Sequence, residues 1–167
     1  MESIEQVLDI VTHELILMGR GDVPLLVINS IDLFKFFGAE GMLRHSQEKD
    51  YCFIATTRQD GFDGIYVYNP TNQVELFFTL FHELGHIATT PEFDDAVEGD
   101  ALIAIEADAS LWALKRITEI GLSVDVFEAA SIDFAHALAT YCDDNPSAIE
   151  TFLDSALEIA VGHYNGN

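Results

Sequence analysis

The segment HELGH at residues 82–86 can act as a chemical unit only if it is helical. Residues four positions apart lie on one face of an α-helix, so His82 and His86 could then bind one metal ion. Glu83 would lie beside that ion, where its carboxylate can take a proton from a water molecule. Zinc suits this chemistry because it is a redox-silent Lewis acid that lowers the pKa of a bound water to about 7. The segment therefore predicts a helix with two zinc ligands and a general base.

The glycine inside this segment is a second signal. Gly85 costs about 1 kcal/mol of helix stability relative to alanine, so its presence calls for a compensating reason. We expect another stretch of backbone to pack closely against the helix at this point, beside His82 and His86.

A catalytic zinc normally has three protein ligands and one open position, and two carboxylates compete for the third place. Glu92 lies ten residues after His82, as in the HExxHxxGxxH pattern, but Thr89 stands where that pattern has glycine. Glu106 lies on the next predicted helix, on a face with small side chains that would allow the two helices to approach closely. Burying that carboxylate without a partner is costly, which favours Glu106 as the ligand.

Supporting residues are less sharply indicated. Asp108 is predicted either to accept a hydrogen bond from the imidazole N–H of a ligand or to be solvated. A side chain that stabilises the oxyanion is also expected, and His136, Tyr141, His163 and Tyr66 are the candidates.

The first half of the chain combines one long helix with short strands. Ser3 and Gln6 form a capping-box pattern that predicts a helix ending near Gly19. Strands are predicted at 24–30, 51–57 and 64–69, the last two as a hairpin, with a brief helix at 32–37.

From Asn72 onward, the sequence predicts helices. Asn72 is predicted to cap a helix that runs to about Thr89, and Asp95 to cap a long helix that stops at Gly121. Two more helices are predicted at about 124–141 and 147–162. The pattern predicts an α+β fold, with a small antiparallel or mixed sheet packed with a helical bundle that carries the HExxH helix, in one domain over residues 1–167.

Charge restricts the partners. The chain has 29 acidic and 7 basic residues, and residues 59–167 contain only Lys115 and Arg116 against 20 acidic side chains. Direct binding to nucleic acid is disfavoured, because phosphate contacts need clustered Lys and Arg. The acidic surface serves either solubility or the attraction of a basic partner.

The composition also predicts a compartment. No apolar run approaches the roughly 20 residues of a transmembrane helix, and the first residues lack the basic region of a secretory signal. Cys52 and Cys142 are the only cysteines and have no CxxC spacing, which indicates two free thiols in a reducing environment. We expect a cytoplasmic protein that does not contact membranes.

Two stretches together resemble the ImmA/IrrE group of gluzincin-type metallopeptidases. They are GIYVYNPTNQVELFFTLFHELGH at 64–86 and IEADASLWAL at 105–114, within a match over about residues 24–117. The resemblance implies a zincin-like fold, with Glu83 as the base and a metal held by His82, His86 and Glu106. It further implies cleavage of helix-turn-helix repressors. The usual Ala is replaced here by Phe81 and the usual Asn by Asp108.

Two functional hypotheses follow. The first is a zinc endopeptidase that cuts a basic regulatory protein, such as a helix-turn-helix repressor. The alternative is a non-enzymatic acidic protein, an inhibitor or nucleic-acid mimic, that sequesters a DNA-binding partner and holds a structural zinc. The intact Glu83 favours the enzyme, because a structural site needs no general base.

Overall fold

The computed structural model describes residues 3–28, 53–59, 62–68, 72–89, 98–142 and 146–164. The chain divides into two compact units, Met1–Glu83 and Leu84–Asn167. The predicted helix at 32–37, Cys52 and Glu92 lie outside the described residues.

The first unit begins with helix α1 (Ile4–Leu17). The Ser3 hydroxyl accepts a hydrogen bond from the backbone N–H of Gln6 at 3.3 Å and caps the helix, as its sequence predicts. The chain leaves the helix at Gly19, whose φ of 73° favours a residue without a Cβ. The helix buries an apolar face that consists of Val7, Val11 and Leu15.

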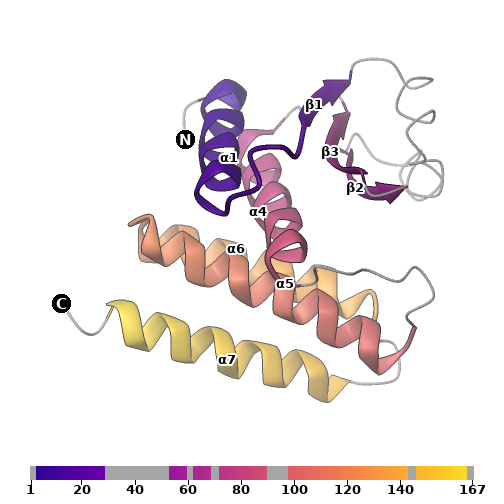
Figure 1. Cartoon of the computed structure of the whole chain (residues 1–167). Coiled ribbons are helices and arrows are strands. Elements are labelled where there is room, and N and C mark those ends of the chain that lie inside the picture. Colours follow the sequence, from indigo (N-terminus) through magenta and orange to yellow (C-terminus); the bar gives the residue numbers. More distant parts are fainter. Residues whose placement is uncertain are drawn as a thin grey trace. The chain divides into compact units, whose positions relative to one another are not determined.

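A small sheet follows in the same unit. It contains β1 (Leu25–Ile28), β2 (Phe53–Gln59) and β3 (Phe62–Tyr68) in the order β1-β3-β2 (Figure 1). Strand β3 pairs in parallel with β1 and antiparallel with β2, and it buries Ile65 and Val67. The strands predicted at 24–30, 51–57 and 64–69 correspond to these three.

Helix α4 (Gln73–Thr89) carries the HELGH segment and crosses the boundary between the two units. The side-chain oxygen of Asn72 accepts hydrogen bonds from the N–H groups of Val74, at 2.9 Å, and Glu75, at 3.4 Å. This cap confirms the predicted start, and the end at Thr89 agrees with the prediction. The apolar side of the helix is fully or almost fully buried, at Leu76, Phe77, Phe78, Leu80, Phe81, Leu84 and Ile87.

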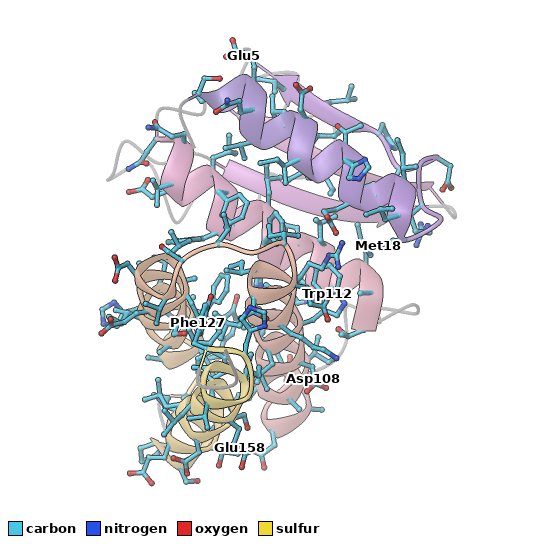
Figure 2. The ribbon with its side chains drawn as sticks, turned by 90° about the vertical axis from the view of Figure 1, so that its left-hand side faces the viewer. Glu5, Met18, Asp108, Trp112, Phe127 and Glu158 are labelled. Carbon is cyan, nitrogen blue, oxygen red and sulfur yellow. The ribbon has the colours of Figure 1, made fainter. Side chains whose placement is uncertain are left out.

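Three helices make up most of the second unit. They are α5 (Asp100–Glu119), α6 (Val124–Ala139) and α7 (Pro146–Tyr164), and each contacts the other two (Figure 1). Phe127 points toward the interior of this group (Figure 2). Its ring meets that of Tyr164 edge-on, with the centroids 5.9 Å apart, and the Tyr164 hydroxyl donates a 2.9 Å hydrogen bond to the carbonyl of Leu122.

One predicted boundary is wrong. Helix α5 begins at Asp100, whereas the capping-box pattern predicts a start at Asp95. The reason lies at Gly99, whose φ of 63° is incompatible with a right-handed helix. The other end is as predicted, because Gly121 has a φ of 80° and ends the helix.

The described residues therefore form five helices and one three-stranded sheet, which belongs to the α+β class. Within the described part of the chain, no helix is long and apolar enough to cross a membrane. The zincin-like fold and the single domain over residues 1–167 stay predictions.

Candidate metal centre

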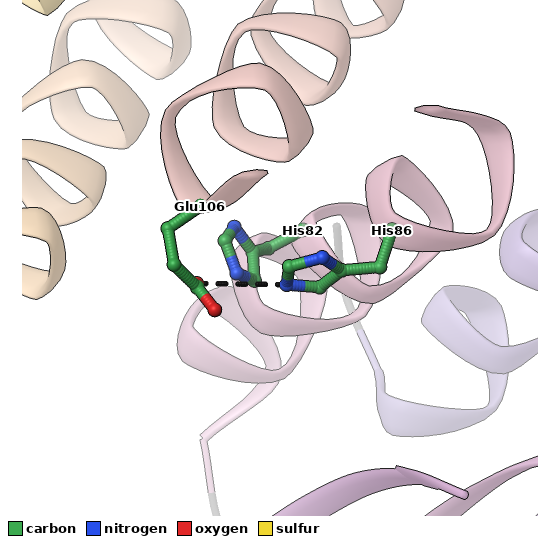
Figure 3. A group of neighbouring side chains, drawn as sticks. All are labelled: His82, His86 and Glu106. Carbon is green, nitrogen blue, oxygen red and sulfur yellow. Dashed lines mark ion pairs between the residues drawn. The ribbon is translucent and has the colours of Figure 1, made fainter. Parts of the chain in front are cut away.

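Three predicted ligands meet at the end of α4 and the middle of α5. His82, His86 and Glu106 each offer one ligand atom, and these atoms all lie within 4.8 Å of one another (Figure 3). The Nε2 atom of His86 lies 3.5 Å from Oε2 of Glu106, and both side chains are only 14% and 13% exposed. His82 is one helical turn before His86, so α4 itself sets the spacing of the two rings.

Gly85 shows how the two helices reach this distance. A Cβ at this position would lie 2.7 Å from the carbonyl carbon and 2.8 Å from the Cα of Ala109. These are backbone atoms, which cannot rotate away as a flexible side chain could. The end of α4 and the middle of α5 therefore touch backbone to backbone, directly before His86 and three residues after Glu106. The close packing that Gly85 predicts is observed, with Ala109 as its partner.

The side of α5 that contacts the end of α4 consists of small residues. Ala109, Ser110 and Ala113 are almost completely buried. The hydroxyl of Ser110 donates a 2.9 Å hydrogen bond to the backbone carbonyl of Glu106, so this small polar group is satisfied inside the helix. The small-residue face is visible in the sequence, but the residue that touches Gly85 is not, since the register between two helices is a tertiary property.

The donor set fits a metal ion. A tetrahedral zinc with bonds of about 2.0–2.2 Å holds its donor atoms roughly 3.3–3.5 Å apart. The 3.5 Å between His86 and Glu106 agrees with that edge. An ordinary ion pair would need only these two residues, whereas His82 brings a second nitrogen donor to the same group. The three residues could therefore hold a transition-metal ion of a kind that accepts imidazole and carboxylate ligands.

Glu83 lies next to this group on the same helix. It follows His82 directly and precedes His86 by three residues, so the helix places it beside the two imidazoles. The residue is partly exposed. Its role as the general base stays a prediction.

Asp108 is not brought to the histidines. Two residues along a helix correspond to a rotation of about 200°, so Asp108 points away from the side of α5 that carries Glu106. It is exposed on α5 (Figure 2). It lines a hollow of about 440 Å³ between α5 and α7, together with residues such as Asp100, Leu111 and Phe152. Its exposure is in line with the solvated alternative, and a role as an acceptor for an imidazole N–H stays a prediction.

None of the predicted oxyanion stabilisers is singled out. His136 and Tyr141 are exposed on α6 and just after it. The ring of His163, near the end of α7, packs edge-on against that of Tyr164, 4.9 Å away. The side chain of Tyr66 lies outside the described part of the chain.

The unit that contains His86 and Glu106 is acidic in composition. Lys115 and Arg116 are the only basic residues of the unit Leu84–Asn167, and both lie near the end of α5. Arg116 forms a 2.8 Å ion pair with Glu119. A carboxylate-rich surface with so few cations favours the accumulation of positively charged ligands.

Comparisons with protein families, with curated proteins and with solved structures find no match. The case for a metal ion at His82, His86 and Glu106 therefore rests on the chemistry of these residues. The ImmA/IrrE resemblance of the two stretches at 64–86 and 105–114 stays a prediction.

Proposed function

We propose that the chain is a zinc-dependent endopeptidase in which His82, His86 and Glu106 hold the metal and Glu83 is the general base. The observation that carries this proposal is the meeting of two imidazoles and one carboxylate beside an intact glutamate. A structural zinc is usually enclosed by four protein ligands, whereas a catalytic one has three and an open position. The three ligands found among the described residues support the catalytic type.

Zinc is preferred to other metals because the proposed reaction is a hydrolysis without electron transfer. When bound, zinc would polarise the scissile carbonyl and lower the pKa of a water molecule to about 7. Two histidines and a carboxylate are also the ligands of non-haem Fe(II) oxygenases. Glu83 supports zinc, because a carboxylate beside the metal has a direct role as a proton carrier in hydrolysis.

The proposed roles of the side chains follow from their positions on α4 and α5. The Glu83 carboxylate accepts a proton from the attacking water as the water oxygen bonds to the carbonyl carbon of the substrate. It then delivers that proton to the departing amine nitrogen while the C–N bond breaks. Oε2 of Glu106 lies 3.5 Å from Nε2 of His86, so Glu106 would supply the third ligand from α5.

The proposed substrate is a basic regulatory protein of the helix-turn-helix repressor kind. Residues 59–167 carry 20 acidic and two basic side chains, which favours encounter with a cationic protein. The resemblance to ImmA/IrrE peptidases supports a repressor as the particular partner, acting within the zincin-like fold that the same resemblance implies.

The decisive experiment is Glu83→Gln. Glutamine keeps the size of the side chain but cannot accept a proton at neutral pH, so we expect unchanged zinc content and a loss of cleavage of about 10²- to 10⁴-fold. Glu75→Gln is the matched control, since Glu75 is an exposed glutamate in the first turn of the same helix. Zinc is measured by elemental analysis and cleavage by mass spectrometry of basic repressor proteins. Normal cleavage by the Glu83 variant would refute the base assignment, and iron in place of zinc would refute the metal.

A second function is favoured by one specific observation, the presence of 16 acidic residues against two basic ones in Leu84–Asn167. This balance also suits a non-enzymatic inhibitor or nucleic-acid mimic that sequesters a DNA-binding protein. Zinc-loaded wild type that binds a basic partner tightly without cutting it would support this alternative.

A further inference from the structure

Helix α7 has an exposed line of large aliphatic side chains. Its inner side is buried at Phe152 and Ala156, which are 1% and 3% exposed. One position further on, Leu153, Leu157 and Val161 are 43%, 61% and 49% exposed. Because these residues are spaced by four, they form a continuous line over two turns of the helix, here called the α7 stripe. Isolated exposed leucines are ordinary, but an aligned set is typical of a contact surface.

The α7 stripe is bordered by an equally regular row of acids. Glu150, Asp154 and Glu158 are exposed and also spaced by four. The row lies on the side of the helix opposite the buried residues, and Figure 2 shows Glu158 projecting away from the other helices of the unit. Helix α7 contains no lysine or arginine. A ligand on the stripe would therefore meet apolar surface along one edge and three carboxylates along the other.

We propose that the α7 stripe docks an amphipathic helix of a basic partner protein. Leucine-type side chains of that helix would cover Leu153, Leu157 and Val161, and its lysines or arginines would face Glu150, Asp154 and Glu158. A partner helix presents one apolar face through side chains at i, i+3, i+4 and i+7, and α7 offers it a line of apolar residues spaced by four. An extended strand would find no open sheet edge on α7.

The charge distinguishes this occupant from two others. A second copy of the chain would place one acidic row against another, on a protein with a net charge of −22. An anionic membrane surface would be repelled by the same carboxylates. Opposite charge along the whole row is met only by a cationic partner. Docking on α7 needs neither the metal nor Glu83, so it goes beyond the proposed peptidase activity and can be tested apart from it.

The role of the α7 stripe is tested with a synthetic helical peptide. The peptide carries leucines along one face and lysines along the flanking positions. Its dissociation constant is measured by fluorescence anisotropy with the full chain, with and without zinc. We expect the double variant Leu153→Gln/Leu157→Gln to weaken binding by about tenfold or more. The control is Val124→Gln/Ile132→Gln on α6, where the two side chains are similarly exposed, at 50% and 52%. This control should bind as wild type.

The role of the acidic row is tested with two triple variants that have the same change in net charge. Glu150→Gln/Asp154→Asn/Glu158→Gln removes the row, whereas Glu5→Gln/Asp125→Asn/Glu128→Gln removes three exposed acids elsewhere. We expect only the first to lose affinity and to flatten the salt dependence of binding.

Equal losses in both triple variants would overturn the proposal, as would a peptide affinity insensitive to the α7 leucines. A wild-type dimer that dissociates in Leu153→Gln/Leu157→Gln, seen by sedimentation, would assign the stripe to a second copy and also overturn it.

Discussion

Two helix contacts in the second unit are built on opposite principles. Where the end of α4 meets α5, Gly85 leaves no room for even one methyl group against the backbone of Ala109. Where α6 meets α7, two aromatic rings fill the space, with the centroids of Phe127 and Tyr164 5.9 Å apart. The first contact fixes a distance between two backbones, and the second fills a volume with side chains.

The difference matters for a metal centre. Donor atoms must be held to within a few tenths of an ångström, and backbone contact transmits the position of one helix to the other without adjustable side chains between them. A ring pair tolerates small rotations and shifts, so it suits a contact that only has to stabilise the fold. The small residues therefore occur beside His86 and Glu106, whereas the rings occur away from the ligands.

The largest effects should come from removing the donors that the close contact brings together. His82→Ala, His86→Ala or Glu106→Ala should reduce zinc affinity by more than the roughly 10- to 100-fold that is typical of residues behind the ligands. Glu92→Ala should change it little. Competition with a chromophoric chelator measures each affinity. Full zinc binding by Glu106→Ala, together with loss in Glu92→Ala, would move the third ligand to Glu92.

The next effect breaks the contact itself and leaves every ligand in place. In Gly85→Ala the new methyl group forces α4 and α5 apart, so we expect a loss of about 1–3 kcal/mol in the free energy of unfolding. Zinc affinity should fall as well, because the separation of His86 and Glu106 depends on this contact. Urea unfolding and the chelator competition measure the two quantities.

Gly162 on α7 provides the matched control, because a Cβ there would meet nothing within 4 Å. Gly162→Ala should keep zinc affinity and gain up to about 1 kcal/mol in the free energy of unfolding, from helix propensity alone. A stabilised Gly85→Ala with normal zinc affinity would show that the two helices can adjust, and the proposed contrast between the contacts would not hold.

Local sequence signals predicted the helices whose ends are set by local hydrogen bonds. Ser3 and Asn72 cap α1 and α4 as expected, since a capping side chain bonds to a backbone N–H two or three residues away. The start of α5 was wrong because Gly99 adopts a positive φ, and nothing in the preceding acidic segment indicates which conformation a glycine will take.

In the candidate site, the sequence likewise predicts what lies within one helix but not how two helices pack. The spacing of His82 and His86 lies within one helix, so the pattern alone predicts that both can reach one ion. Glu106 was favoured by the small residues beside it, but its distance from His86 depends on how α5 packs. For Asp108 the sequence leaves two roles open, because it does not show which side of α5 faces α7; the residue lines the hollow between these two helices.

The smallest effect is expected at the contact between the rings of Phe127 and Tyr164. Tyr164→Phe keeps the edge-on packing against Phe127 but removes the hydrogen bond to the carbonyl of Leu122. We expect a loss of about 1 kcal/mol in the free energy of unfolding and no change in zinc affinity. Urea unfolding at neutral pH and the chelator competition test both, and a fall in zinc affinity would show that the ring contact also positions the ligands.

The stability difference between wild type and Tyr164→Phe should also depend on pH, in a direction that follows from the pKa of Tyr164. Burial raises the pKa of the Tyr164 hydroxyl above its ordinary value of 10.0, because the charged phenolate is poorly solvated there. The unfolded chain then loses this proton at a lower pH than the folded chain, so it binds fewer protons and the free energy of unfolding falls as pH rises. This contribution to stability is complete below the unfolded pKa and is lost as pH rises through the folded one.

The stability difference between wild type and Tyr164→Phe, measured by urea unfolding, should therefore be constant near neutral pH and shrink above pH 10. A difference that grows above that pH would mean that the folded chain binds the phenolate in preference to the phenol.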